Sequence, residues 1–430
     1  MKRWVGMVLA LGAGLIAGFV SPGQASAQSA FGCDGLARLG YMPVVEGRGG
    51  VFFRVHPDLH NFYPFSDETV ERLGELSDAL ATGGTRLIYL PVPTKSLAMP
   101  AALTPEAEDF GFDPALATTV YRDILKRLED RGIATVDVRK PMVQAQGGAP
   151  TYFRSDHRWS AEGARLAANA VAARLAALNL EIPGTGTYQT EPSGEVTLTS
   201  NMFAQIQQHC QNPIPPVTTS AFVTPPAPDV AAAPLVVVGT EYSDVNTGNF
   251  TSYLSRASGL LVAGYSVPGG GGFAAISSYL TSDAFRTNRP KVLIWEVPVE
   301  ANLAQFADQP LRELIALAGT TCRFSLTLFA GDQPNRVSLD LSTLDPGLST
   351  TLFIDGGGAP SPEALFTFRS RTGLSRSRVV LRHPDQVLNG RFALPLSGLW
   401  PDGAASVEVE LTEPFGPGAL ALACIYSGKG

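Results

Sequence analysis

The segment LIYLPV, from Leu87 to Val92, is an apolar run closed by Pro93. A short run of this kind, bounded by a turn signal, is typical of a buried strand. Apolar residues then recur at helical spacing from about Asp113 to Gly132, and the segment Ala134–Val138 predicts another strand. A strand, a helix and a strand in this order indicate a βαβ unit and therefore a parallel sheet.

The same alternation continues along the chain. Ser160 is a suitable N-cap for an alanine-rich helix that ends near Leu178. Two mainly apolar runs, Leu235–Val238 and Lys291–Val297, predict further central strands, whereas the proline-rich stretch 211–234 predicts an extended surface loop. We expect a doubly wound α/β sheet with its chemistry at the carboxyl ends of the strands.

Beyond about Thr320 the pattern changes to short alternating segments separated by Gly, Pro and Asp. This pattern predicts a small all-β sandwich. The expected domains are therefore an α/β domain over residues 28–318 and a sandwich over 319–430. The predicted strands of the sandwich are 324–328, 337–341, 352–354, 377–381 and 406–411.

The N-terminus combines Lys2 and Arg3 with an apolar run, Trp4–Val20, and a small-residue site that ends at Ala27. This combination predicts a secretory signal peptide, residues 1–27, with a membrane anchor as the alternative. Outside the cytosol four cysteines indicate disulfides rather than metal ligation. Their positions favour one bridge in each domain, Cys33–Cys210 and Cys322–Cys424, and no close spacing predicts a metal site.

Two further classes of ligand are not expected. The formal net charge of −7 provides no basic footprint for nucleic acid. The glycine run Gly269–Gly272 shows no strand-to-helix context of a phosphate cradle, so it predicts a mobile loop near the site, and no cofactor is expected.

Four segments in order carry a family resemblance; they are 91–96, 152–164, 236–250 and 269–296. Together they resemble the SGNH hydrolase-like domain of the AlgX and AlgJ family of alginate O-acetyltransferases, over roughly residues 35–305. The resemblance implies acetylation of an exopolysaccharide in the periplasm through an acyl-enzyme, with a membrane-bound O-acyltransferase as a partner that supplies acetyl groups. It also implies that the sandwich is a carbohydrate-binding module, which takes an anionic or neutral polysaccharide.

The family implies a Ser-His-Asp apparatus, from which this chain departs at two positions. Asp156 matches, but Arg158 occupies the histidine position, with His157 beside it. Glu241 occupies the serine position, and Ser243 follows two residues later. Arginine is not a base in proteins, because its pKa exceeds ~12.

Three hypotheses remain open. Asp156, His157 and Ser243 form a displaced catalytic set, for acetyl transfer or for an acetyl esterase; or Glu241 pairs with Arg158 in a domain that binds glycan as a scaffold without turnover; or Glu241 and Asp156 carry a different carboxylate chemistry.

Residues for polysaccharide binding are also predicted. Lys95 follows the first strand, and the sandwich contributes Arg376, Arg378 and Arg382 with Trp400 as a stacking platform. Because alternate strand residues share a face, Arg376 and Arg378 are expected to present two guanidinium groups together. The alternative is that the lysine and the arginines are ordinary exposed charges and that Trp400 belongs to the core.

Overall fold

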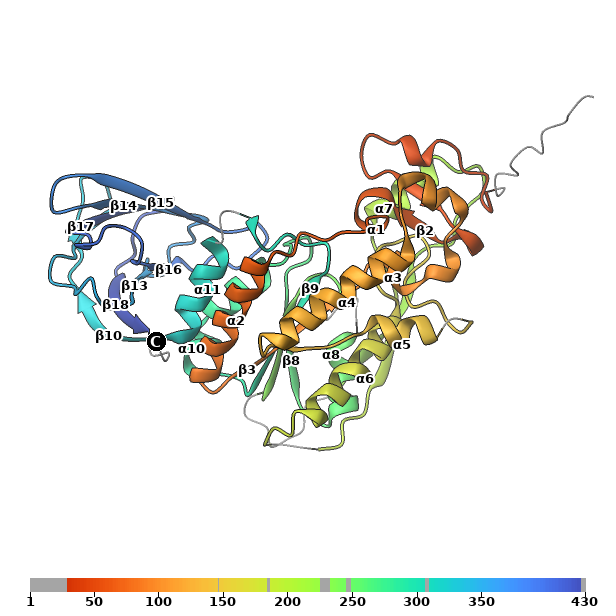
Figure 1. Cartoon of the computed structure of the whole chain (residues 1–430), viewed down its shortest axis with the longest axis horizontal. Helices are drawn as coiled ribbons and strands as arrows, with labels where there is room; N and C mark the ends of the chain where they lie inside the picture. Colours follow the sequence, from red (N-terminus) through yellow and green to blue (C-terminus); the bar gives the residue numbers. More distant parts are fainter. Residues whose placement is uncertain are drawn as a thin grey trace, which may run out of the picture.

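The computed structural model describes residues 29–145, 147–183, 186–224, 233–244, 249–305 and 309–426 (Figure 1). The predicted signal peptide, 1–27, lies outside these residues. Within the part that is described, no helix is long and apolar enough to cross a membrane.

A five-stranded parallel sheet forms the centre of the first domain, as predicted. The three central strands are buried on both faces, which is the pattern of a sheet covered on both sides. In spatial order the strands are β4 (Ala134–Thr135), β3 (Arg86–Val92), β9 (Val292–Pro298), β7 (Leu235–Gly239) and β8 (Val262–Ser266).

Helices cover both faces of this sheet. One face packs against α2 (Asp67–Thr82), α4 (Pro114–Asp130), α9 (Ala274–Thr281), α10 (Asp283–Thr287) and α11 (Gln309–Gly319). The other face packs against α5 (Arg139–Gln144), α6 (Ala161–Ala177) and α8 (Phe250–Ser258). The short helices of this domain are α1 (Val55–Asp58), α3 (Lys95–Ala98) and four 3₁₀ turns at 36–38, 48–50, 100–102 and 105–110.

The predicted helices begin at side-chain caps. Asp113 accepts the amides of Ala115 and Leu116 at the start of α4, and Ser160 accepts the amide of Gly163 at the start of α6. Each cap satisfies backbone donors that the first helical turn leaves unpaired.

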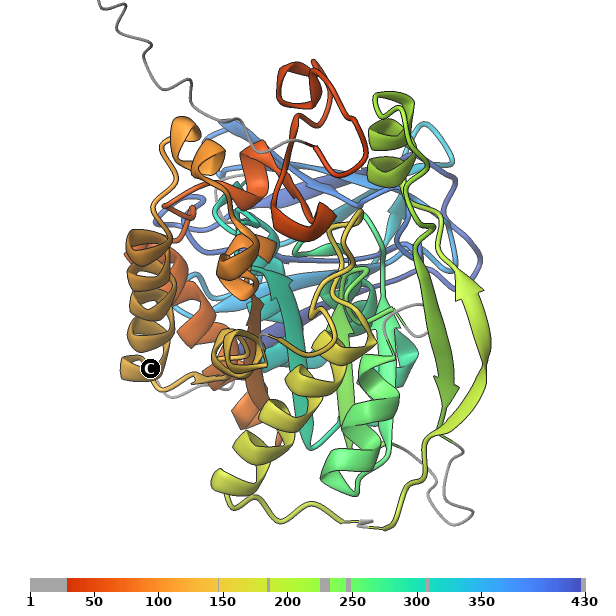
Figure 2. The same cartoon turned by 90° about the vertical axis from the view of Figure 1, so that its right-hand side faces the viewer.

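A disulfide joins two distant segments of the N-terminal half. Cys33 pairs with Cys210, which ties the chain before β1 (Val44–Glu46) and β2 (Phe52–Arg54) to α7 (Asn201–Gln208). Beyond α7 the structure corrects the sequence interpretation, because the predicted surface loop contains a strand. Thr218–Val223, strand β6, pairs with β5 (Glu191–Thr197) in a largely exposed, two-stranded antiparallel sheet (Figure 2).

The C-terminal domain is an antiparallel sandwich that begins at Thr320. Cys322 and Cys424 face each other on neighbouring strands and form the second predicted disulfide. One sheet contains β10 (Thr320–Leu326), β18 (Leu420–Tyr426), β13 (Thr350–Asp355) and β16 (Arg391–Pro395), and the other contains β11 (Phe329–Ala330), β12 (Arg336–Asp340), β17 (Ser406–Leu411), β14 (Glu363–Arg369) and β15 (Ser375–Leu381).

The two domains meet through α11 (Figure 1). Arg382 of the sandwich forms a bidentate ion pair with Glu313 of α11, with both N–O distances 2.6 Å and side chains only 4% and 2% exposed. Arg391 adds ion pairs to Asp283 and Asp355. The buried Arg382–Glu313 pair and the partly exposed Arg391–Asp283 pair therefore link the two domains.

Candidate functional site

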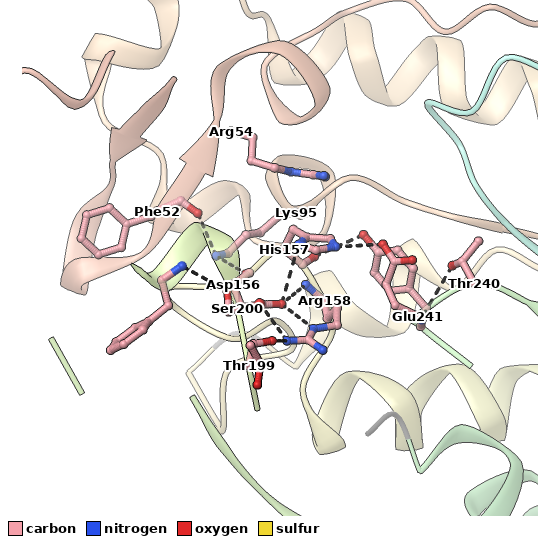
Figure 3. A network of polar contacts seen from close by, with 12 residues as sticks. Phe52, Arg54, Lys95, Asp156, His157, Arg158, Thr199, Ser200, Thr240 and Glu241 are labelled. Atoms are coloured by element: carbon pink, nitrogen blue, oxygen red, sulfur yellow. Dashed lines mark hydrogen bonds and ion pairs between the residues drawn. The ribbon is translucent and has the colours of Figure 1, made fainter. Parts of the chain in front are cut away.

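The candidate site lies where strands β3 and β7 end, as expected for a parallel sheet (Figure 3). The segment 152–159 closes over these ends as a small hairpin, with Tyr152 bridging to Trp159 and the Phe153 amide donating to the Arg158 carbonyl. Trp159 is buried against the rings of Tyr242 and Phe250, which anchors the hairpin to the core.

Lys95 binds the backbone of this hairpin at its turn. Its side chain is fully buried, and Nζ donates to the backbone carbonyls of Phe52, Arg154 and Asp156 at 2.8, 2.8 and 3.0 Å. Burial lowers the pKa of Lys95 to about 7, against the attraction of nearby carboxylates. The expectation that Lys95 contacts a sugar is therefore corrected, because its ammonium is enclosed by backbone oxygens.

Asp156 makes its hydrogen bonds to Arg158, the residue two positions later in the hairpin. Its carboxylate accepts from the Arg158 amide and Nε at 2.8 Å and from Nη2 at 3.0 Å. Burial alone would raise the pKa of Asp156, but these hydrogen bonds and the charges of His157 and Arg158 hold it well below its ordinary value. The structure thus places an arginine where the family resemblance expects the histidine.

His157 turns to the opposite side and meets Glu241. Its Nε2 lies 2.9 Å from Glu241 Oε1, and Nδ1 lies 3.8 Å from Asp156 Oδ1. The other carboxylate oxygen of Glu241 accepts the Gly269 amide at 3.1 Å. Burial would raise the pKa of Glu241, but His157 and this amide lower it to about 2. Glu241 pairs with His157 in this structure, and Arg158 pairs with Asp156.

Ser243 is not brought to His157. It is 1% exposed, and its hydroxyl donates to Glu296 Oε2 at 2.9 Å. The same carboxyl accepts the Thr240 amide at 2.7 Å. Burial raises the pKa of Glu296 to about 7, although these hydrogen bonds act in the opposite direction. A Cβ at Gly239 would meet Glu296 Oε2 at 2.3 Å and Ser243 Oγ at 2.4 Å, so the turn requires glycine there.

The glycine run also differs from its prediction. It links strand β8 to helix α9, so the strand-to-helix context that the sequence did not reveal is present. Its first residue, Gly269, has a positive φ of 75°, which places its amide against Glu241.

The predicted binding residues of the sandwich divide into two groups. Arg382 is corrected, because it is buried in the ion pair with Glu313. Arg376 and Arg378 do share a face, but their cross-strand partners Phe368 and Phe366 are core residues, so that face points inward at the edge of the sheet.

The two guanidinium groups on that face are held differently. Arg378 donates to the carbonyls of Pro395 and Ser397 at 3.2 and 3.3 Å. Arg376 remains exposed and lies 5.1 Å over the ring of Trp400, which packs against the core while partly buried.

Several charged residues near the site were missed. Arg54, which Figure 3 shows beside the hairpin, donates to Asp58 and to Glu300. Burial alone would lower the pKa of Arg54, but Asp58 raises it well above its ordinary value. The sequence does contain signals that could have identified these residues. Arg54 and Asp58 have the i, i+4 spacing of a helical ion pair, and Glu296 is an acidic residue within an otherwise apolar strand. Over the described ranges, no three His, Cys, Asp or Glu residues gather as metal ligands.

Comparison with known proteins identifies the family. Residues 44–299 match the model of the SGNH hydrolase-like domain of acetyltransferase AlgX. The alginate biosynthesis protein AlgX of Azotobacter vinelandii is 28% identical over 334 residues, which cover 74% of this chain and 65% of that protein. The probable alginate O-acetylase AlgJ of Pseudomonas fluorescens is 29% identical, over 61% of this chain and 71% of that protein.

Solved structures agree with the sequence comparison. The structure of Pseudomonas aeruginosa AlgX superposes with a TM-score of 0.75 at 26% identity, covering 90% of this chain and 95% of that one. The O-acetyltransferase domain of Pseudomonas putida AlgJ has a TM-score of 0.52 at 25% identity, covering 63% of this chain and 98% of that domain. The chain belongs to the family of SGNH hydrolase-like proteins related to acetyltransferase AlgX.

Proposed function

We propose that this protein acts in the O-acetylation of an anionic exopolysaccharide in the periplasm, where it binds the polysaccharide without forming an acetyl-serine. The observation that carries this proposal is the pairing of His157 with Glu241, while Ser243, the serine that follows strand β7, is buried against Glu296. The acetylation role is supported by the names of the relatives, which are alginate biosynthesis protein and probable alginate O-acetylase.

A serine nucleophile needs an accessible hydroxyl with a base within hydrogen-bond reach. Ser243 lacks the access, because it is 1% exposed beneath the Gly239–Thr240 turn. No histidine base is in place for it either, because the Ser243 hydroxyl donates to Glu296 and His157 Nε2 meets Glu241 instead. Both halves of an acyl-transfer pair are occupied by other contacts.

Glu241 is also a poor nucleophile in this arrangement. Its two oxygens accept from His157 and from the Gly269 amide, which stabilise the carboxylate as it is. Attack on an acetyl donor would give a mixed anhydride and lose this stabilisation. The geometry therefore favours a role for Glu241 in contacting a sugar. It does not favour Glu241 as the group that accepts an acetyl unit.

The proposed compartment and the proposed assembly are supported by the family membership and by the sequence. Two disulfides suit an oxidising compartment, and residues 1–27 carry the pattern of an export signal. In such a compartment acetyl groups come through the membrane, so the proposed partner is a membrane-bound O-acyltransferase, with the present chain presenting the polymer.

One observation favours a second function. The Ser243 hydroxyl is hydrogen-bonded to a carboxyl group, Glu296, whose pKa is raised to about 7, and a base that titrates near neutrality is suited to activate a hydroxyl. If the turn opens to admit substrate, Ser243 would attack the carbonyl carbon of an acetyl ester and pass its proton to Glu296. The ester C–O bond would then break, and Glu296 would return the proton to the departing alcohol. A sugar hydroxyl or water would take the acetyl group from the acetyl-serine and restore the Ser243 hydroxyl.

The test compares two measurements on the purified mature protein. We expect hydrolysis of 4-nitrophenyl acetate at the buffer rate, together with binding of alginate oligosaccharides in calorimetry. Glu241→Ala and His157→Ala should weaken the binding and leave the hydrolysis unchanged. Hydrolysis well above buffer that disappears in Ser243→Ala would replace this proposal with the second function.

A further inference from the structure

A groove with a volume of about 1000 Å³ lies between the two domains, away from the candidate site. Its walls are α2 and α11 on one side and the ends of β13 and β16 on the other, and Figure 1 shows these two helices side by side next to the sandwich. Thr82, the last residue of α2, lines it just before strand β3 begins. The groove is therefore near the amino ends of the parallel strands, whereas the candidate site is at their carboxyl ends.

Arg312 is the cation in this groove that is not neutralised by the protein. Arg72 pairs with Glu75, and Arg131 pairs with Asp78, so these charges compensate each other. Among the residues that the structure describes, Arg312 has no ion-pair or hydrogen-bond partner, and its Nε is buried without one. A guanidinium with no carboxylate partner is free to bind an anion from outside, which would add charge-assisted hydrogen bonds that the protein does not supply.

A second guanidinium lies close to Arg312. Arg378 donates to the carbonyls of Pro395 and Ser397, and both of these residues line the groove. Burial, followed by the repulsion of Arg312 and Arg376, lowers the pKa of Arg378. The field at this end of the groove is therefore positive, although the chain as a whole is acidic.

The remaining surface suits a sugar ring. Hydroxyl groups of Ser349, Thr351 and Ser397 line the sandwich side, and Ile315 with Ala316 adds an apolar strip one helical turn after Arg312. A sugar presents hydroxyls at its edge and C–H groups on its face, so both kinds of surface are matched. The volume is at the upper end of the ~300–1,000 Å³ that is usual for ligand sites.

The groove is also fixed in shape. Glu313, the residue next to Arg312, is locked to Arg382 in the buried ion pair, so α11 cannot turn Arg312 away from the groove. Binding then requires little ordering of the protein, which favours affinity.

We propose that this interdomain groove is a second polysaccharide site, in which Arg312 binds a sugar carboxylate and the Ser349, Thr351 and Ser397 hydroxyls bind the ring oxygens. The choice of an acidic polysaccharide rests on the proposed function, and the position of the site rests on the groove alone.

The test is titration calorimetry of the whole mature protein with alginate oligosaccharides and, separately, with dextran oligosaccharides. We expect Arg312→Gln to raise the dissociation constant for alginate about tenfold or more, equivalent to about 1.4 kcal/mol. Ser349→Trp, at an exposed position, should block the groove without disturbing the core. The matched control, Arg256→Gln, removes an exposed arginine on α8 at the other face of the sheet and should leave binding unchanged.

The outcomes separate the two proposals. Alginate binding that is equal in wild type, Arg312→Gln and Ser349→Trp would overturn the groove site and leave the proposed function standing. Equal binding of dextran and alginate would overturn the acidic ligand class. A wild-type protein that binds no alginate at all would remove the proposed function itself.

Discussion

Replacement of Glu313 by alanine should destabilise the protein severely, because it leaves a buried guanidinium without its counter-charge. Arg382 is 4% exposed, and Glu313 supplies both of its carboxylate contacts at 2.6 Å. After the change the guanidinium of Arg382 retains, among the residues that the structure describes, the Arg391 carbonyl at 2.8 Å and the face of the Phe392 ring. Removal of one partner of a buried pair costs about 3–5 kcal/mol.

The alanine also orphans the Ala393 amide, which donates to the same carboxylate at 3.0 Å, so we expect the upper part of that range. The assay is urea unfolding followed by circular dichroism. The free energies of unfolding are compared between variants whose dependence on urea concentration, the m-value, is the same. The partly exposed pair Arg336–Glu410, with side chains 29% and 31% exposed, provides the control, and Glu410→Ala should cost about 1 kcal/mol or less.

A double replacement, Glu313→Leu with Arg382→Met, tests the reason for the effect. If desolvated charge is the cause, this double variant should recover most of the loss, because an apolar pair of similar volume avoids the buried charge. A loss below about 1 kcal/mol in Glu313→Ala, equal to that of the partly exposed control, would refute the reasoning.

Two further predictions concern the site. Burial lowers the pKa of Lys95 in the folded state to about 7, from an ordinary value of 10.5. Between these two pH values the unfolded state binds one more proton than the folded state, so the free energy of unfolding should rise with pH. Lys95→Met should abolish this rise, measured as the free energy of unfolding at pH 7 and at pH 9.5. Restoring the family pattern with Glu241→Ser and Arg158→His together should raise 4-nitrophenyl acetate hydrolysis at least about tenfold above wild type, since general base catalysis contributes ~10²–10⁴-fold. Either change alone should have no such effect, and an inactive double variant would mean that the two positions are not a catalytic pair.

Regular elements were predicted best where local burial patterns decide them. Strand β3 and helix α4 were expected within two residues of their observed bounds, because apolar spacing and the Asp113 cap are encoded within each segment. Strand β6 was missed, because its residues follow a proline-rich stretch and it forms only by pairing with β5, which is distant in sequence.

The candidate site was predicted in its residues but not in its contacts. Four of the predicted residues do gather at one place: Asp156, His157, Arg158 and Glu241. One hypothesis paired Glu241 with Arg158, whereas in the structure Glu241 pairs with His157 and Arg158 pairs with Asp156. His157 and Glu241 are 84 residues apart, so no local spacing states which of two adjacent side chains reaches the carboxylate. Lys95 was expected at the surface, because nothing in its neighbours reveals that three backbone carbonyls will surround it.

The amino-acid sequence by itself determined the parallel α/β domain, the following sandwich, the two disulfides and the family, because apolar periodicity and motif order are properties of single segments. Only the tertiary structure decided that Ser243 faces Glu296, that Arg382 locks the domains together and that Arg312 lines a groove between them. These contacts depend on where distant segments meet, and the burial that sets their charges exists only once both domains are packed.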